Sequence, residues 1–147
     1  MPKAVRIELF RRRQTKNRLR AVLKSYAFVE RCDDYDKAAV DILLIERARQ
    51  GVKDRSEAEA VVQGATVGAV VIVDDPWGRD LAERVGCSFH GTFWILRRFF
   101  ELGLSSSSVT RNHFVELLRR GTRLPWDVVN EFLVDVGESP LPEWDGD

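Results

Sequence analysis

The chain has 147 residues, of which 44% are hydrophobic and 31% charged, and its formal net charge is zero. That composition is typical of a globular domain with a real core, and it excludes a chain too polar to fold. No apolar run approaches the roughly 20 residues that span a bilayer, so we expect no membrane segment. The basic N-terminus lacks the apolar core of a signal peptide, and we expect a cytoplasmic protein whose cysteines, Cys32 and Cys87, are free thiols.

Charge is distributed unevenly along the chain. Residues 1–31 hold ten Lys/Arg and two Glu, a net charge of +8, and the remainder carries −8. Residues 1–31 thus form a basic arm that could bind a polyanion, with Arg11, Arg12 and Arg13 in contact with a nucleic-acid backbone. The arm could equally fold onto the acidic remainder of its own chain or onto an acidic partner. We therefore divide the chain into a basic helical arm (1–31), an α/β domain (32–138) and a flexible acidic tail (139–147).

Secondary structure is predicted from apolar spacing and from glycine stop signals. The predicted helices, in chain order, cover residues 5–29, 35–49, 56–67, 79–85, 93–102, 109–120 and 126–136. The predicted strands cover residues 69–73 and 87–89. Strands that alternate with helices on short connections predict a three-layer α/β fold with a short parallel sheet flanked by helices.

The sequence also predicts the residues that cap two of the helices and the burial of one strand. Asp33 or Asp34 could cap the helix over 35–49. Ser56 followed by Glu59 is a capping-box pattern that predicts the next helix start. The strand over 69–73 has no polar residue, which favours a parallel strand buried on both faces.

Three carboxylates stand at points where an α/β fold gathers reactive groups. Glu57 lies in the first turn of a predicted helix, and Asp74 and Asp75 follow the apolar strand directly. Side chains at the carboxyl ends of strands meet at one edge of the sheet, and carboxylate oxygens suit hard divalent cations. Glu57 could equally be a plain first-turn helix acid, and Asp74-Asp75-Pro76 an Asx turn.

An ordered set of short motifs runs through this region. The motifs are Ser56-Glu57-Ala58-Glu59-Ala60, Val71-Ile72-Val73-Asp74-Asp75, Gly78-Arg79, Gly91-Thr92 and Leu102-Gly103-Leu104. In this order and spacing, residues 50–138 resemble the PIN-domain family, in particular the branch of VapC-type ribonuclease toxins. The resemblance implies a metal-dependent endoribonuclease that hydrolyses RNA phosphodiester bonds.

The resemblance also implies roles for individual residues and partners. Glu57, Asp74 and Asp75 would be the catalytic residues and the ligands of Mg²⁺ or Mn²⁺, with Asp80 a weaker candidate for an outer ligand. Arg79 would contact phosphate, and the arginines at 11–13 would help to hold RNA. The partners implied are RNA, a protein antitoxin and a second copy of the chain in a homodimer, with no membrane.

The N-terminal region departs from the family pattern. A PIN domain opens with an apolar strand that ends in an aspartate ligand, whereas residues 4–26 are basic and helix-like. The nearest acids do not follow an apolar strand: Asp33, Asp34, Asp36 and Asp41. The alternative to an enzyme is therefore a degenerate, weakly active or inactive PIN-like domain that acts as an RNA-binding or protein-interaction module.

The helix over 93–102 mixes aromatic residues with Arg97 and Arg98. These side chains could stack on bases, but helical spacing favours packing of Phe93, Leu96 and Phe100 on one face, with the arginines in water. An aromatic residue on the other face, such as Trp94, would suit a dimer or partner surface.

Overall fold

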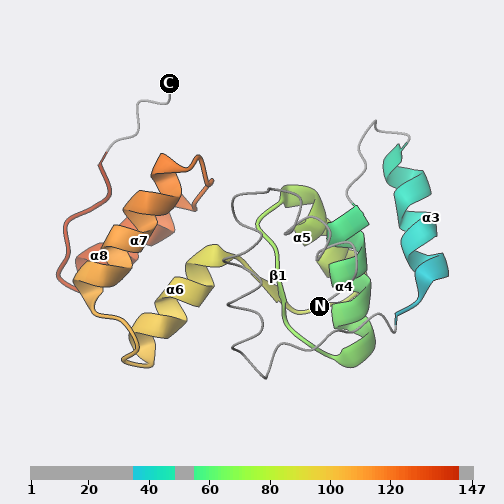
Figure 1. Ribbon diagram of the computed structural model, residues 1–147, viewed down its shortest axis with the longest axis horizontal. Coiled ribbons are helices and arrows are strands. Elements are labelled where there is room, and N and C mark those ends of the chain that lie inside the picture. Colours follow the sequence, from blue (N-terminus) through green and yellow to red (C-terminus); the bar gives the residue numbers. More distant parts are fainter. Residues whose placement is uncertain (1–34, 49–54, 143–147) are drawn as a thin grey trace, which may run out of the picture. The chain divides into compact units, whose positions relative to one another are not determined.

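The computed structural model describes residues 35–48 and 55–142, and it confirms the expected α/β class (Figure 1). Across these ranges the chain forms six helices and a two-stranded parallel sheet. The predicted helix over 5–29, the arginines at 11–13 and the candidate caps at 33 and 34 lie outside the described residues. No helix in the described ranges is both long and apolar enough to cross a membrane.

The chain separates into two compact units, the first ending at Phe89 and the second beginning at His90. The described elements of the first unit are α3 (Lys37–Ala48), α4 (Arg55–Val67), β1 (Val71–Ile72) and α5 (Pro76–Arg84), and β1 pairs with β2 (Phe89–His90). The second unit contains α6 (Thr92–Glu101), α7 (Ser107–Arg119) and α8 (Trp126–Asp135).

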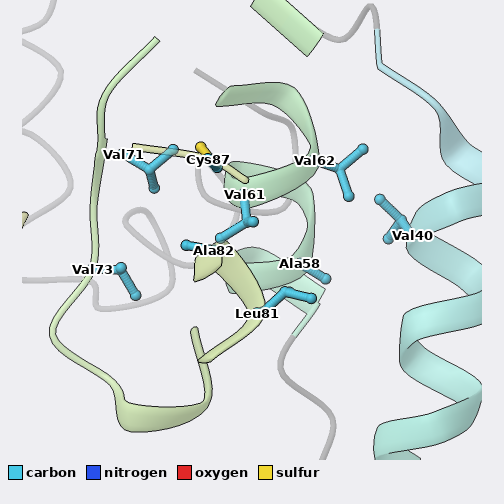
Figure 2. Close-up of a cluster of buried hydrophobic side chains, with 9 residues drawn as sticks. All are labelled: Val40, Ala58, Val61, Val62, Val71, Val73, Leu81, Ala82 and Cys87. Atoms are coloured by element: carbon cyan, nitrogen blue, oxygen red, sulfur yellow. The ribbon is translucent and has the colours of Figure 1, made fainter. Parts of the chain in front are cut away.

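A single buried cluster joins the elements of the first unit. Figure 2 shows its side chains: Val40, Ala58, Val61, Val62, Val71, Val73, Leu81, Ala82 and Cys87. Val40 of α3 faces Val62 of α4, and the strand residues Val71 and Val73 face the side where α4 and α5 lie (Figure 2). The strand exit is thus held against two helices by apolar burial.

The strand prediction was wrong in length and in burial. β1 covers only Val71–Ile72, and Val71 and Val73 are buried whereas Val70 and Ile72 are 49% and 42% exposed. Successive side chains of a strand point to opposite faces, and α4 and α5 cover one of them. The second strand covers Phe89–His90 and not 87–89. Ser88 precedes this strand, and its carbonyl accepts a hydrogen bond from Val71 N at 2.9 Å.

The helix starts differ from both predicted caps. α3 begins at Lys37, and Asp36 is its cap: Asp36 Oδ1 accepts from Ala39 N at 3.0 Å, and the Asp36 carbonyl accepts from Val40 N. Arg55 is already helical, so Ser56 lies inside α4 and is not its cap. The helix ends follow the sequence more closely, since Gly68 and Gly86 come after α4 and α5 with left-handed φ values of 65° and 70°.

The helices of the second unit pack around aromatic side chains. Phe114, Val129, Leu133 and Leu141 are buried, and Phe132 makes edge-to-face contacts with Phe93, Phe100 and Phe114. The expected packing of Phe93, Leu96 and Phe100 is therefore confirmed.

The first residues of the predicted flexible tail are packed instead. Leu141 is 4% exposed, and its N–H donates to Asn130 Oδ1 at 2.8 Å. The guanidinium of Arg111 donates to the carbonyls of Ser139 and Pro140. The buried leucine and the hydrogen bonds from Arg111 together hold this segment in place. Such contacts cannot be inferred from the composition of the segment.

Candidate functional site

A pocket of about 340 Å³ lies between the start of α4 and the exit of β1. The residues that line it are Ser56, Glu57, Ala60, Val61, Val71, Ile72, Val73, Asp74 and Asp75. Helix α4 runs beside β1, so its first turn lies at the height where the strand ends. The three carboxylates that the sequence singles out therefore border one pocket within the first unit.

Glu57 is held close to the start of α5. Its Oε2 accepts a hydrogen bond from Ser56 Oγ at 3.0 Å. A Cβ added at Gly78 would overlap Val73 Cγ2 and would lie 3.6 Å from Glu57 Cγ. The missing side chain at Gly78 therefore lets the first turn of α5 approach both the strand and Glu57.

Asp75 is the N-cap of α5. Its Oδ1 accepts from Trp77 N at 2.9 Å and from Gly78 N at 3.1 Å, and Pro76 occupies the first helical turn. The local Asx-type bonding that Asp-Pro favours is thus present. Capping fixes the Asp75 carboxylate at the pocket rim through one oxygen, and the described residues make no hydrogen bond to the other.

Asp74 and Arg79 form an ion pair across the turn between β1 and α5. Arg79 Nη2 lies 3.3 Å from Asp74 Oδ1, and Arg79 Nε donates to the Val73 carbonyl at 3.1 Å. The Asp74 and Arg79 side chains are 34% and 40% exposed, so both can be reached from solvent. A guanidinium paired with a carboxylate that lines a pocket is suited to contact with phosphate.

The other acids considered from sequence have separate roles. Asp80 pairs with Arg84 at 3.2 Å, and neither lines the pocket. Asp36 caps α3, and Asp41 pairs with Arg55 at 3.2 Å. The candidates at 33 and 34 lie outside the described residues.

Glu59, two residues after Glu57, belongs to a structural ion pair. It is 3% exposed and accepts from Arg55 Nε at 2.8 Å. The hydrogen bond to Glu59 is the largest cause that raises the pKa of Arg55, and Asp41 adds to it. The motif Glu57-Ala58-Glu59 thus sends one acid to the pocket and one to the interior.

The carboxylate oxygens at the pocket are the kind of ligand that a hard divalent cation prefers. Among the described residues, no three or more His, Cys, Asp or Glu side chains stand close enough together to hold a metal ion. Mg²⁺ commonly takes one or two carboxylates and completes its shell with water and phosphate oxygens. The pocket carboxylates fit that mode of binding, in which the protein provides only part of the coordination.

Ser56 and Gly78 are the site residues that sequence reasoning missed as such. Ser56 was expected to cap a helix, yet it hydrogen-bonds Glu57 at the pocket. Gly78 was named as part of the motif Gly78-Arg79, yet its lack of a side chain lets α5 approach Glu57. The available signals were the position of Ser56 directly before Glu57 and that of Gly78 three residues after Asp75.

Comparison with known proteins gives one match. A family model described as a PIN domain matches residues 1–138, which includes the basic arm. No curated protein and no solved structure matches the chain.

Proposed function

The chain belongs to the PIN-domain family, and on this premise we propose that it is a Mg²⁺- or Mn²⁺-dependent endoribonuclease of the toxin type that works in the cytoplasm. The observation that carries the proposal is the convergence of Glu57, Asp74 and Asp75 on one pocket at a strand exit. Carboxylates gathered there are suited to hydrolysis of a phosphodiester bond.

In this proposal the carboxylates of Glu57, Asp74 and Asp75 provide part of the coordination of the divalent cation, and water and phosphate oxygens complete it. When bound, the cation offsets negative charge on the scissile phosphate and makes water more acidic. Ser56 orients Glu57 through its hydrogen bond, and the N-cap bonds orient Asp75. These contacts fix the carboxylates before substrate arrives, which lowers the cost of assembling the site.

Arg79 would serve in two ways. Its bond to the Val73 carbonyl anchors the guanidinium, and its ion pair orients Asp74. The remaining N–H groups of the guanidinium are donors suited to a phosphate oxygen of RNA. Arg11, Arg12 and Arg13 would add sequence-independent contacts to the RNA backbone, on the strength of the +8 charge of residues 1–31.

Three partners are proposed: a second copy of the chain, a protein antitoxin and RNA. Exposed Ile42 and Ile45 on α3, at 59% and 60%, give an apolar surface that a second copy could cover in a homodimer. A protein antitoxin is supported by the family resemblance. RNA as substrate is supported by membership of the PIN-domain family.

One observation favours a second candidate function. The described residues provide no complete group of metal ligands, which suits a degenerate PIN domain that binds RNA or protein without efficient cleavage. In that case the acids at the strand exit would be structural, with Asp75 as a cap and Asp74 as the partner of Arg79.

A calorimetric titration with Mn²⁺ tests the proposal. The wild-type chain is compared with the triple variant Glu57→Gln/Asp74→Asn/Asp75→Asn, and with a control of equal charge change at exposed positions outside the pocket, Glu83→Gln/Glu131→Gln/Asp135→Asn. We expect binding by the wild type and the control and none by the pocket variant. RNA cleavage should follow the same order. If the wild type binds no Mn²⁺ at millimolar concentration, the enzyme proposal is wrong and the binding-module function remains.

A further inference from the structure

A second pocket lies on α6, within the second unit. It has a volume of about 410 Å³ and is lined by Phe93, Trp94, Arg97, Arg98 and Glu101. Residues 94, 97, 98 and 101 are spaced at i, i+3, i+4 and i+7, so they share one face of the helix. We call this surface the α6 pocket. It combines an indole with two guanidinium groups.

The indole of Trp94 is held in place by a neighbouring ring. The rings of His90 and Trp94 are stacked, with centroids 4.4 Å apart and an interplanar angle of 11°. Phe93, next along the helix, faces the aromatic core through its contacts with Phe114 and Phe132. Because stacking already orders Trp94, a ligand that binds to it loses less side-chain entropy than it would on a free indole.

The two arginines share a single carboxylate. Arg97 Nε lies 2.7 Å from Glu101 Oε1, and Arg98 Nη1 lies 2.8 Å from Glu101 Oε2. Both hydrogen bonds lower the pKa of Glu101, and the one from Arg98 has the larger effect. The Arg97 and Arg98 side chains remain 52% and 44% exposed. The pocket therefore has one positive charge in excess and donors that an anion can reach.

We propose that the α6 pocket binds one nucleotide of single-stranded RNA, with the base stacked on Trp94 and the phosphate bound by Arg97 and Arg98. An aromatic face accepts any base, and a guanidinium pair suits phosphate oxygens. The side chains of residues three and four apart on a helix lie about 5–6 Å from one another at Cβ, so a single nucleotide can reach both groups. The choice of RNA rests on the proposed ribonuclease function.

Glu101 gives the proposal a specific consequence. The carboxylate accepts from one N–H of each guanidinium and adds a negative charge beside them, so an incoming phosphate must compete with it for the two arginines. Removing the charge at Glu101 should strengthen RNA binding, whereas removing a guanidinium should weaken it. A purely structural ion pair on α6 predicts no change in RNA affinity for either substitution.

Fluorescence anisotropy of a labelled oligouridylate tests the proposal on the full chain, with EDTA present to prevent cleavage. We expect Trp94→Leu to weaken binding about tenfold, and Trp94→Phe, which keeps a ring, to weaken it less. Arg97→Ala/Arg98→Ala should lower the slope of log affinity against log salt by about 0.7, the value for the single phosphate that the two arginines contact. Glu101→Gln should raise the affinity about twofold or more, because it removes a repulsive charge near the phosphate.

Matched controls come from the ion pair between Arg120 and Glu116 on α7, at 2.7 Å. Arg119→Ala/Arg120→Ala and Glu116→Gln make the same charge changes on exposed side chains at the end of α7 and should leave both affinity and salt slope unchanged. Thermal unfolding of each variant checks that the fold is intact. The arginine and Glu101 variants do not alter buried side chains, so they keep the test valid even if Trp94→Leu destabilises the second unit.

The outcomes separate this inference from the function on which it rests. If the wild type cleaves RNA but the Trp94, Arg97/Arg98 and Glu101 variants bind like the controls, the α6 pocket is not a nucleotide site and the ribonuclease proposal stands. If binding depends on Trp94 and the arginines but no RNA is cleaved, the nucleotide site stands and the ribonuclease proposal falls. If the wild type does not bind the oligonucleotide, the α6 proposal is overturned.

Discussion

Arg79 is bound at two points to the segment that ends β1: its Nη2 lies 3.3 Å from Asp74 Oδ1, and its Nε donates to the Val73 carbonyl at 3.1 Å. Both side chains are partly exposed, so the ion pair by itself stabilises the fold by at most about 1 kcal/mol. Its main consequence is positional, because it sets the direction of the Asp74 carboxylate and of the guanidinium at the pocket rim.

Arg79→Lys is expected to reduce RNA cleavage about 10- to 100-fold, because an ammonium group cannot reproduce the planar two-point contact and Asp74 loses its orientation. The thermal midpoint should move little. Arg84→Lys, in the exposed pair with Asp80 on the same helix, is the matched control. Equal cleavage by both variants would mean that Arg79 has no part in the site.

Glu57→Gln and Asp74→Asn should each lower the cleavage rate by about 100-fold or more, since loss of one carboxylate removes a cation ligand worth several kcal/mol of charge stabilisation. Single-turnover cleavage of a labelled RNA at saturating Mn²⁺ measures the effect. Glu83→Gln, at an exposed position of α5, is the control. Unchanged cleavage in Asp74→Asn would remove Asp74 from the mechanism.

Asp75 allows capping and metal binding to be separated. Asp75→Ala should lower the free energy of unfolding by about 1 kcal/mol, because the N–H groups of Trp77 and Gly78 lose their acceptor. Asp75→Asn keeps an N-cap acceptor, so it should unfold like the wild type and yet bind Mn²⁺ more weakly. Denaturant unfolding and calorimetry measure the two effects. An Asn variant that keeps full metal affinity would show that Asp75 is a cap alone.

Gly78→Ala and Gly64→Ala compare two close approaches of a helix to β1. Alanine at position 78 would overlap Val73, directly after β1, and alanine at position 64 would overlap Val71 of β1. We expect a loss of about 1–3 kcal/mol of stability in both, despite the higher helix propensity of alanine. Only Gly78 lies beside Glu57, so cleavage per folded molecule should fall in Gly78→Ala and persist in Gly64→Ala. The opposite order would contradict the placement of the site.

Burial raises the pKa of the Cys87 thiol, which is 6% exposed. A folded-state pKa above the unfolded value means that the stability associated with the neutral thiol is fully present below the unfolded pKa. That stability is lost as the pH rises through the raised folded pKa. In a Cys32→Ser background, the thermal midpoint should therefore fall more steeply with Cys87 than with Cys87→Ala as the pH rises above the ordinary thiol pKa of about 8.5.

Alkylation of the native chain provides a second measure of the same group. Cys87 should react slowly at neutral pH, because the thiolate is the reactive form and the sulfur is buried. Fast labelling under native conditions would show that the first unit opens readily around Cys87. Denatured protein is the reference for full reactivity.

Local sequence signals predicted most of the described helices correctly. Apolar spacing and the glycines that follow the helices depend on neighbours within a few residues, and the bounds of α4, α6, α7 and α8 lie close to their predicted ranges. The cap of α3 and the burial of Ile72 were predicted wrongly. Asp36 could be distinguished from Asp33 and Asp34 only by where the backbone turns, and the burial of a strand face depends on which elements pack against it.

The sequence by itself determined the α/β class, the helices with their glycine stops, and the membership of Glu57, Asp74 and Asp75 in an ordered family pattern. Only the tertiary structure decided which acids share a pocket. In the folded chain Glu57 lies beside the strand exit, and Glu59 is buried and accepts a hydrogen bond from Arg55. Asp36 caps α3, and Asp41 pairs with Arg55. The physical reason is that such groupings depend on how α4 and α5 pack against β1, a relation between segments distant in sequence that local propensities do not encode.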